Sequence, residues 1–139
     1  PLSRVDRAQA RRGILGVTAA CDVTARDLQK KDATFARSKS FDTFCPLGPG
    51  VLVNAMLDEL SVTTRINGEV RQEGHARDMI FDIPELVGYV SEIMTLNPGD
   101  VILTGSPEGV GPLHPGDVIE VEIEGMEPLT NPVEARSAA

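Results

Sequence analysis

An Asn-Gly pair at residues 67–68 places the strongest constraint on how this chain can fold. Six residues rich in threonine and β-branched side chains precede the pair at 61–66, and a second strand-like segment follows at 69–72. Asn-Gly between two such segments is typical of a two-residue hairpin turn, because both central residues must adopt positive φ. The sequence therefore predicts an antiparallel β-hairpin.

Further strands are predicted on both sides of this hairpin. Residues 14–20 are small and apolar, which is typical of a covered strand, and residues 51–54 predict a short one. Residues 101–103 have the composition of a buried strand that stops at Thr104. Residues 118–124 alternate apolar and acidic side chains, which predicts a strand with one face in water.

Two or three short helices are predicted to accompany the strands. Residues 4–12 form a surface helix in this interpretation, and residues 83–94 carry apolar side chains at helical spacing behind a capping Asp82. We expect the second helix to pack on the sheet. Thr24 is placed to cap a third, short helix that begins near Arg26. The expected fold class is α+β and mainly β.

Composition limits the kinds of partner. A chain of 139 residues fits one domain, and no apolar run approaches the roughly 20 residues of a membrane span. The net charge of −8 argues against binding to nucleic acid. Two cysteines without a secretory signal favour reduced thiols and a cytoplasmic location. Residues 1–39 nevertheless hold nine of the 13 basic residues and four of the 21 acids. This excess suits a small anionic substrate, although the arginines of an exposed helix at 4–12 explain part of it equally well.

Charged and small residues beside the apolar segments are the candidates for a site. Asp22 stands at the mouth of the first predicted strand, where a carboxylate needs a cation or hydrogen-bond donors. Arg26 and Lys39 could be site residues or solvated surface charges. Gly105 would let its backbone amide and the Ser106 hydroxyl approach a carboxylate closely, although a plain turn after a strand explains the pair equally well.

Several dissimilar segments stand in a fixed order, at 21–29, 37–49, 67–72, 79–81, 94–96 and 98–107. Together they resemble the fumarylacetoacetate hydrolase family. The branch they resemble most contains 2-hydroxyhepta-2,4-diene-1,7-dioate isomerases and acylpyruvate or fumarylpyruvate hydrolases. This resemblance covers about Ile14 to Val133 and implies a rolled mixed β-sandwich with short helices that forms a homodimer.

The resemblance also implies roles for the candidate residues. Asp22 would be a ligand of Mg²⁺ or Mn²⁺, with Ca²⁺ as a crystallographic substitute, together with two glutamates of a Glu-x-Glu motif. Lys39 would face the substrate carboxylate or enolate, and Arg26 would orient Asp22 or contact substrate. Weaker substrate contacts are expected from Gln29, Gly105 and Ser106.

One departure from the family pattern leaves the activity open. No Glu-x-Glu motif precedes Asp22, so we expect the 139 residues to be the C-terminal part of a catalytic domain. Glu120 and Glu122 have the spacing of such a motif but not its position, and we interpret them as a solvated strand face. The resemblance implies metal-dependent hydrolysis or isomerisation of a 2-oxo or 2-hydroxy-diene dicarboxylic acid through an enolate. The alternatives are an inactive fragment or pairing subunit, and an oxaloacetate-type decarboxylase.

Overall fold

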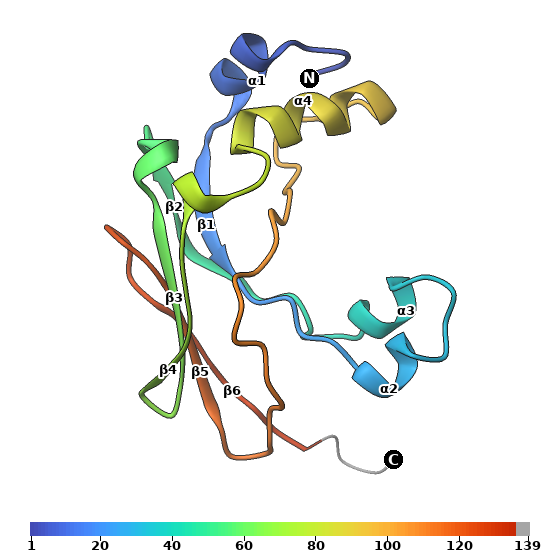
Figure 1. Ribbon diagram of the computed structural model, residues 1–139, viewed down its shortest axis with the longest axis vertical. Coiled ribbons are helices and arrows are strands. Elements are labelled where there is room, and N and C mark those ends of the chain that lie inside the picture. The colour runs from blue at the N-terminus through green and yellow to red at the C-terminus, as the bar shows by residue number, and fades with distance from the viewer. Residues whose placement is uncertain (136–139) are drawn as a thin grey trace.

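The computed structural model describes residues 1–135, and two antiparallel sheets dominate it (Figure 1). The smaller sheet pairs β1 with β2, and the larger has the order β4-β3-β5-β6. The expected α+β, mainly β class is confirmed. The strands are β1 (Gly16–Ala20), β2 (Leu47–Val53), β3 (Ser61–Ile66), β4 (Glu69–His75), β5 (Val118–Ile123) and β6 (Leu129–Pro132).

The predicted hairpin is confirmed as the β3–β4 pair. Its turn residues Asn67 and Gly68 have φ of 54° and 82°, as a two-residue turn requires. On the other side of β3, β5 pairs antiparallel, with Ile66 opposite Ile119. The Asn67 side chain accepts a hydrogen bond of 2.9 Å from the amide of Val118, which ties the hairpin tip to the start of β5.

The two sheets share one apolar core. Ala19 of β1 packs against buried side chains of β5 and β6, so the smaller sheet lies across the larger. The opposite face of β5 carries the glutamates, with Glu122 exposed and Glu120 half-buried. They therefore form the water-facing side predicted from the alternation. The buried members of this sheet cluster are Ala19, Ile119, Val121 and Leu129.

A second core lies between the helices α1 (Arg7–Gly13) and α4 (Ile83–Ile93). Asp82 caps α4 as predicted, accepting a hydrogen bond of 2.8 Å from the amide of Glu85. The expectation that α4 packs on the sheet is wrong, because its main contact is with α1. The buried members of this helical cluster are Ala10, Val87 and Leu96.

Backbone contacts at the N-terminus explain that arrangement. The amide and carbonyl of Leu2 bond to the carbonyl and amide of Leu96, and the amide of Val5 donates to the buried Ser91 hydroxyl at 3.1 Å. These contacts fix α1 against α4. The first helix also begins at Arg7, later than predicted, because Asp6 caps it in a capping box with Gln9.

Residues 101–103 are not a strand, contrary to the prediction. They make no ladder pairing in the described part of the chain, and Val101 and Leu103 are 54% and 43% exposed. Only Ile102 packs against the helical cluster, and it is half-buried, so the apolar run has no fully covered side chain. Prediction also shortened β2 and missed β6, whose Asn131 and Pro132 are poor strand formers.

Residues 22–45, which we term the lobe, project from the ends of β1 and β2 (Figure 1). The lobe holds the short helices α2 (Arg26–Gln29) and α3 (Ala36–Lys39). Two backbone hydrogen bonds close its base, from Cys21 to Pro46 at 3.1 Å and from Val23 to Phe44 at 2.9 Å. The remaining short helices are η1 (Leu57–Glu59) and η2 (Ala76–Asp78). None of the helices in residues 1–135 has the length and apolarity needed to cross a membrane.

Candidate functional site

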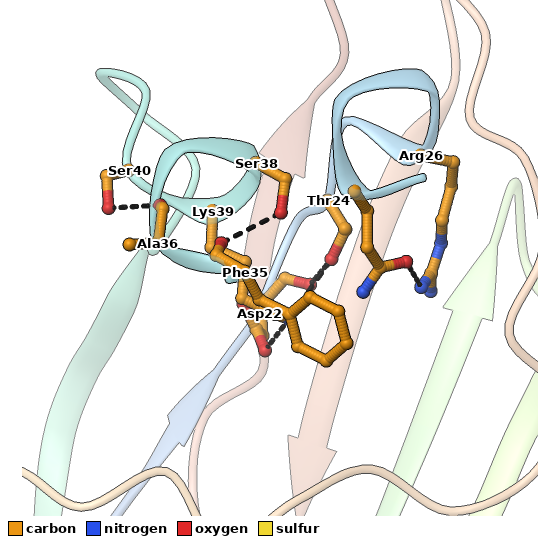
Figure 2. Close-up of polar contacts among 9 residues, drawn as sticks. Asp22, Thr24, Arg26, Phe35, Ala36, Ser38, Lys39 and Ser40 are labelled. Atoms are coloured by element: carbon orange, nitrogen blue, oxygen red, sulfur yellow. Dashed lines mark hydrogen bonds and ion pairs between the residues drawn. The ribbon is translucent and has the colours of Figure 1, made fainter. Parts of the chain in front are cut away.

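An ion pair between Asp22 and Lys39 forms the centre of the lobe (Figure 2). Asp22 follows β1, while Lys39 is the last residue of α3. Both side chains are 32% exposed, and the Lys39 ammonium also donates to the Thr24 hydroxyl at 3.1 Å. The partner that the Asp22 carboxylate requires is therefore the lysine of the candidate set. The structure joins two of the predicted site residues directly.

Thr24 belongs to this centre and does not cap α2, so that prediction is wrong. The N-cap residue of α2 is Ala25, which offers no side-chain hydrogen bond. The Thr24 hydroxyl instead accepts from Lys39 and donates to the Asp22 carbonyl at 3.3 Å. Its role was missed because helix capping and side-chain bridging favour the same residue type.

Arg26 and Gln29 form a separate pair on α2. The Arg26 guanidinium donates to the Gln29 side-chain oxygen at 2.8 Å, one turn along the helix. Within the described residues, neither side chain has a hydrogen bond to Asp22 or Lys39. Arg26 is exposed and lies apart from the ion pair in Figure 2.

The segment before Lys39 is held by polar contacts. Ser38 is fully buried, and its hydroxyl donates to the Phe35 carbonyl at 2.8 Å. Arg37 binds the Asp32 carboxylate through two hydrogen bonds, of 2.7 and 2.5 Å, across the turn into α3. These bonds lower the pKa of Asp32. The sequence signal for this pair was weak, because opposite charges five residues apart are common on surfaces.

Gly105 and Ser106 lie outside direct contact with the ion pair. Both are exposed, and no hydrogen bond in residues 1–135 joins them to Asp22 or Lys39. Gly105 has a φ of 101°, a conformation that favours glycine, with open space around it. The described contacts therefore leave their predicted role in substrate binding as a prediction.

The residues present do not form a divalent-metal site by themselves. No three His, Cys, Asp or Glu side chains within residues 1–135 gather as metal ligands would. The Asp22 carboxylate is already paired with Lys39, whereas a hard cation takes about six oxygen ligands. Burial raises the pKa of the thiol of Cys21, the neighbour of Asp22, and the charges of Asp22 and Cys45 add to this.

The fold and this lobe agree with a family of known enzymes. The model of the C-terminal domain of fumarylacetoacetate (FAA) hydrolase matches residues 1–134. The chain belongs to the fumarylacetoacetate hydrolase family, which confirms the resemblance seen in the sequence.

Similar proteins carry several activities in their names. The crystal structure of 5-carboxymethyl-2-hydroxymuconate delta-isomerase from Mycobacterium smegmatis has a TM-score of 0.95 and 45% identity, over 99% of this chain and 55% of that one. Oxaloacetate tautomerase YisK of Bacillus subtilis is 43% identical over 94% of this chain and 47% of its own length. The mitochondrial oxaloacetate decarboxylase of Dictyostelium discoideum is 40% identical over 88% of this chain and 59% of its own length. The chain spans about half the length of the curated relatives it matches.

Proposed function

We propose that this protein acts on a small anionic 2-oxo acid, or on its enol form, as a hydrolase or isomerase that stabilises an enolate. The observation that carries the proposal is the Lys39 ammonium held at the end of α3 by Asp22 and Thr24 and still a third exposed. Relatives named as oxaloacetate tautomerase and as 5-carboxymethyl-2-hydroxymuconate isomerase support it, since both names imply keto–enol or double-bond chemistry of 2-oxo acids.

The bonding of Lys39 leaves it able to receive an anion. An ammonium group has three protons, and Asp22 and Thr24 engage two of them. The third proton can bind a substrate carboxylate or an enolate oxygen. Asp22 keeps the ammonium in place, so the positive charge is already positioned when the enolate forms. Such preorganised charge is typically worth about 10²–10³ in rate.

Lys39→Met tests this role. In an assay that follows enol absorbance with oxaloacetate, an acylpyruvate and the heptadienedioate, the unmodified protein should speed the decay of at least one. Lys39→Met should slow that decay by about 10²–10³. Lys39→Arg should restore only part of the rate, because a planar fork does not replace a compact ammonium. Lys30→Met changes an exposed lysine of the same lobe and serves as the control. Equal losses in the Lys30 and Lys39 variants would contradict the proposal.

A requirement for Mg²⁺ or Mn²⁺ is a separate proposal that derives from the family. Such a site would need oxygen ligands in addition to Asp22, the carboxylate that the described residues offer there. In a full-length context that supplies those ligands, calorimetric titration should show that Asp22→Ala removes most of the divalent-cation affinity, whereas Glu122→Ala on the outer sheet face leaves it unchanged. Equal affinity in the Asp22 variant and the unmodified protein would exclude Asp22 as a ligand.

A second candidate function is a binding or pairing subunit that lacks activity. It is favoured by the single carboxylate at the centre of the lobe. This candidate predicts calorimetric binding of oxalate, a planar dianion that resembles an enolate, without turnover of any of the three substrates.

Product analysis separates the remaining outcomes, since a decarboxylase releases carbon dioxide from oxaloacetate and a tautomerase does not. A homodimer is also proposed from the family, and sedimentation analysis tests it. A cytoplasmic location is proposed from the two cysteines and the absence of a recognisable secretory signal in the sequence.

A further inference from the structure

We infer that the inner face of β4 positions the loop that carries Gly105 and Ser106, with Gln72 and Gly74 as positioning residues for substrate binding. The inference rests on the proposed function, because it gives that loop a role toward the 2-oxo acid. It concerns residues 105–109, which follow the irregular segment after α4.

The inner face of β4 differs from those of its neighbours. Directly opposite residues of antiparallel strands share a face, and Gly74 lies opposite Val62, which packs into the sheet cluster. Gln72 lies opposite Thr64 on the same face. The corresponding positions of β5 carry Ile119, Val121 and Ile123, so apolar side chains line the neighbouring strand. β4 places there a long amide and a residue without a side chain.

Gln72 and Gly74 both contact the loop at Pro107. The Gln72 side-chain nitrogen donates to the Pro107 carbonyl at 2.7 Å in a half-buried position. The Pro107 ring fills the space above Gly74, where an added Cβ would lie 2.9 Å from the Pro107 Cβ. Real Cβ atoms avoid such a distance, so Pro107 would have to move if Gly74 were alanine.

A third contact lies two residues further along the loop, at Gly109. It completes the part of β4 that holds the loop, Arg71, Gln72 and Gly74, which we term the dock. A Cβ on Gly109 would lie 1.9 Å from the Arg71 carbonyl oxygen, and Gly109 has a φ of 98°. Only glycine permits this approach of the two backbones. Three contacts of the loop, two at Pro107 and one at Gly109, thus fit Arg71, Gln72 and Gly74 of β4.

The loop depends on this dock because its ends are anchored elsewhere. Ile102 packs into the helical cluster and Leu113 into the sheet cluster, which Cys21 also contacts beside Asp22. Between these anchors, Gly105 and Ser106 are exposed, and nothing lies within 4 Å of a Cβ built on Gly105. Their position is therefore set through the adjoining Pro107.

Two variants test the dock, and a third is the matched control. Gly74→Ala displaces Pro107, and Gln72→Glu keeps the side-chain length but removes the donor. Gly111→Ala makes the same glycine-to-alanine change in the loop, where an added Cβ meets nothing within 4 Å. The Gly74 position has no positive φ, so its alanine adds no backbone strain. If Gly74→Ala shows no thermal unfolding transition, it is not folded, and Gln72→Glu alone then tests the inference.

Steady-state kinetics with the best 2-oxo acid should show a raised KM with kcat nearly kept. We expect KM to rise about tenfold in Gly74→Ala and Gln72→Glu, because the displaced loop would lose about one hydrogen bond to the anionic substrate. KM should stay unchanged in Gly111→Ala. Gln72→Lys, which restores a donor toward the Pro107 carbonyl, should recover much of the loss. A KM in both test variants equal to that of Gly111→Ala would overturn the inference.

A second readout separates this inference from the proposed function. If the unmodified protein turns over none of the three substrates, the proposed function fails, and hydrogen exchange then decides the dock. Faster exchange of amides in 103–109 in Gly74→Ala and Gln72→Glu, but not in Gly111→Ala, supports β4 as the positioning surface. Equal exchange in all three variants overturns it.

Discussion

The four-stranded sheet and the lobe are held together by different forces. In the sheet, buried apolar side chains of β5 and β6 pack against Ala19 of the smaller sheet. In the lobe, α2 has no buried residue and α3 has only Ser38, a polar one. Backbone hydrogen bonds and ion pairs of Asp22 and Asp32 hold the lobe instead.

This difference indicates a division between stability and chemistry. Apolar burial contributes roughly 25 cal/mol per Å² to stability, and placing an unpaired charge in such a core is costly. Surface ion pairs contribute little to stability. A lobe held by polar contacts can therefore present Lys39 and Asp22 to a ligand without weakening the core. Substitutions in the two regions should have separable effects on unfolding and on ligand binding.

The largest expected effect on stability is in the sheet. Ile119→Ala removes a side chain that is 5% exposed, which should lower the free energy of unfolding by about 2–5 kcal/mol in denaturant titrations. Leu15→Ala, at a position 76% exposed, is the control and should change it by less than about 0.5 kcal/mol. Similar losses for the two variants would mean that the sheet cluster is not the main core.

A smaller effect is expected in the lobe, and it depends on pH. Hydrogen bonds from Arg37 lower the pKa of Asp32 below its ordinary value of 3.8. The stabilisation by this pair is thus fully present above pH 3.8 and is lost as the pH falls through the lowered pKa. Asp32→Asn should be slightly less stable than the unmodified protein at pH 6, and the two should converge in acid. A difference that grows on acidification would contradict the assigned pairing.

Local patterns predicted those parts of the fold that local interactions determine. The hairpin around Asn67 and the helix capped by Asp82 depend on turn and cap chemistry within a few residues. The packing of α4 on α1 depends on contacts between Leu2 and Leu96, which no local pattern reveals. The strand predicted at 101–103 failed because an apolar run does not specify its hydrogen-bond partners.

Prediction of the candidate site was limited in the same way. The need of Asp22 for a partner follows from its position after an apolar strand, and Lys39 meets that need. The use of Thr24 as a bridge, and the separate pairing of Arg26 with Gln29, depend on how the lobe folds back on itself. The sequence identifies these residues as candidates but does not show which of their side chains contact one another.

Backbone NMR titration with oxalate tests the central claim most directly. The account predicts that shifts concentrate in the lobe around Asp22 and Lys39, and that Lys39→Met abolishes them while Lys30→Met does not. The sheet offers the competing site, a hollow of about 240 Å³ whose lining includes Arg71 and His114. Shifts confined to that hollow, or shifts in the lobe that persist in Lys39→Met, would contradict the assignment of ligand binding to the Asp22–Lys39 centre.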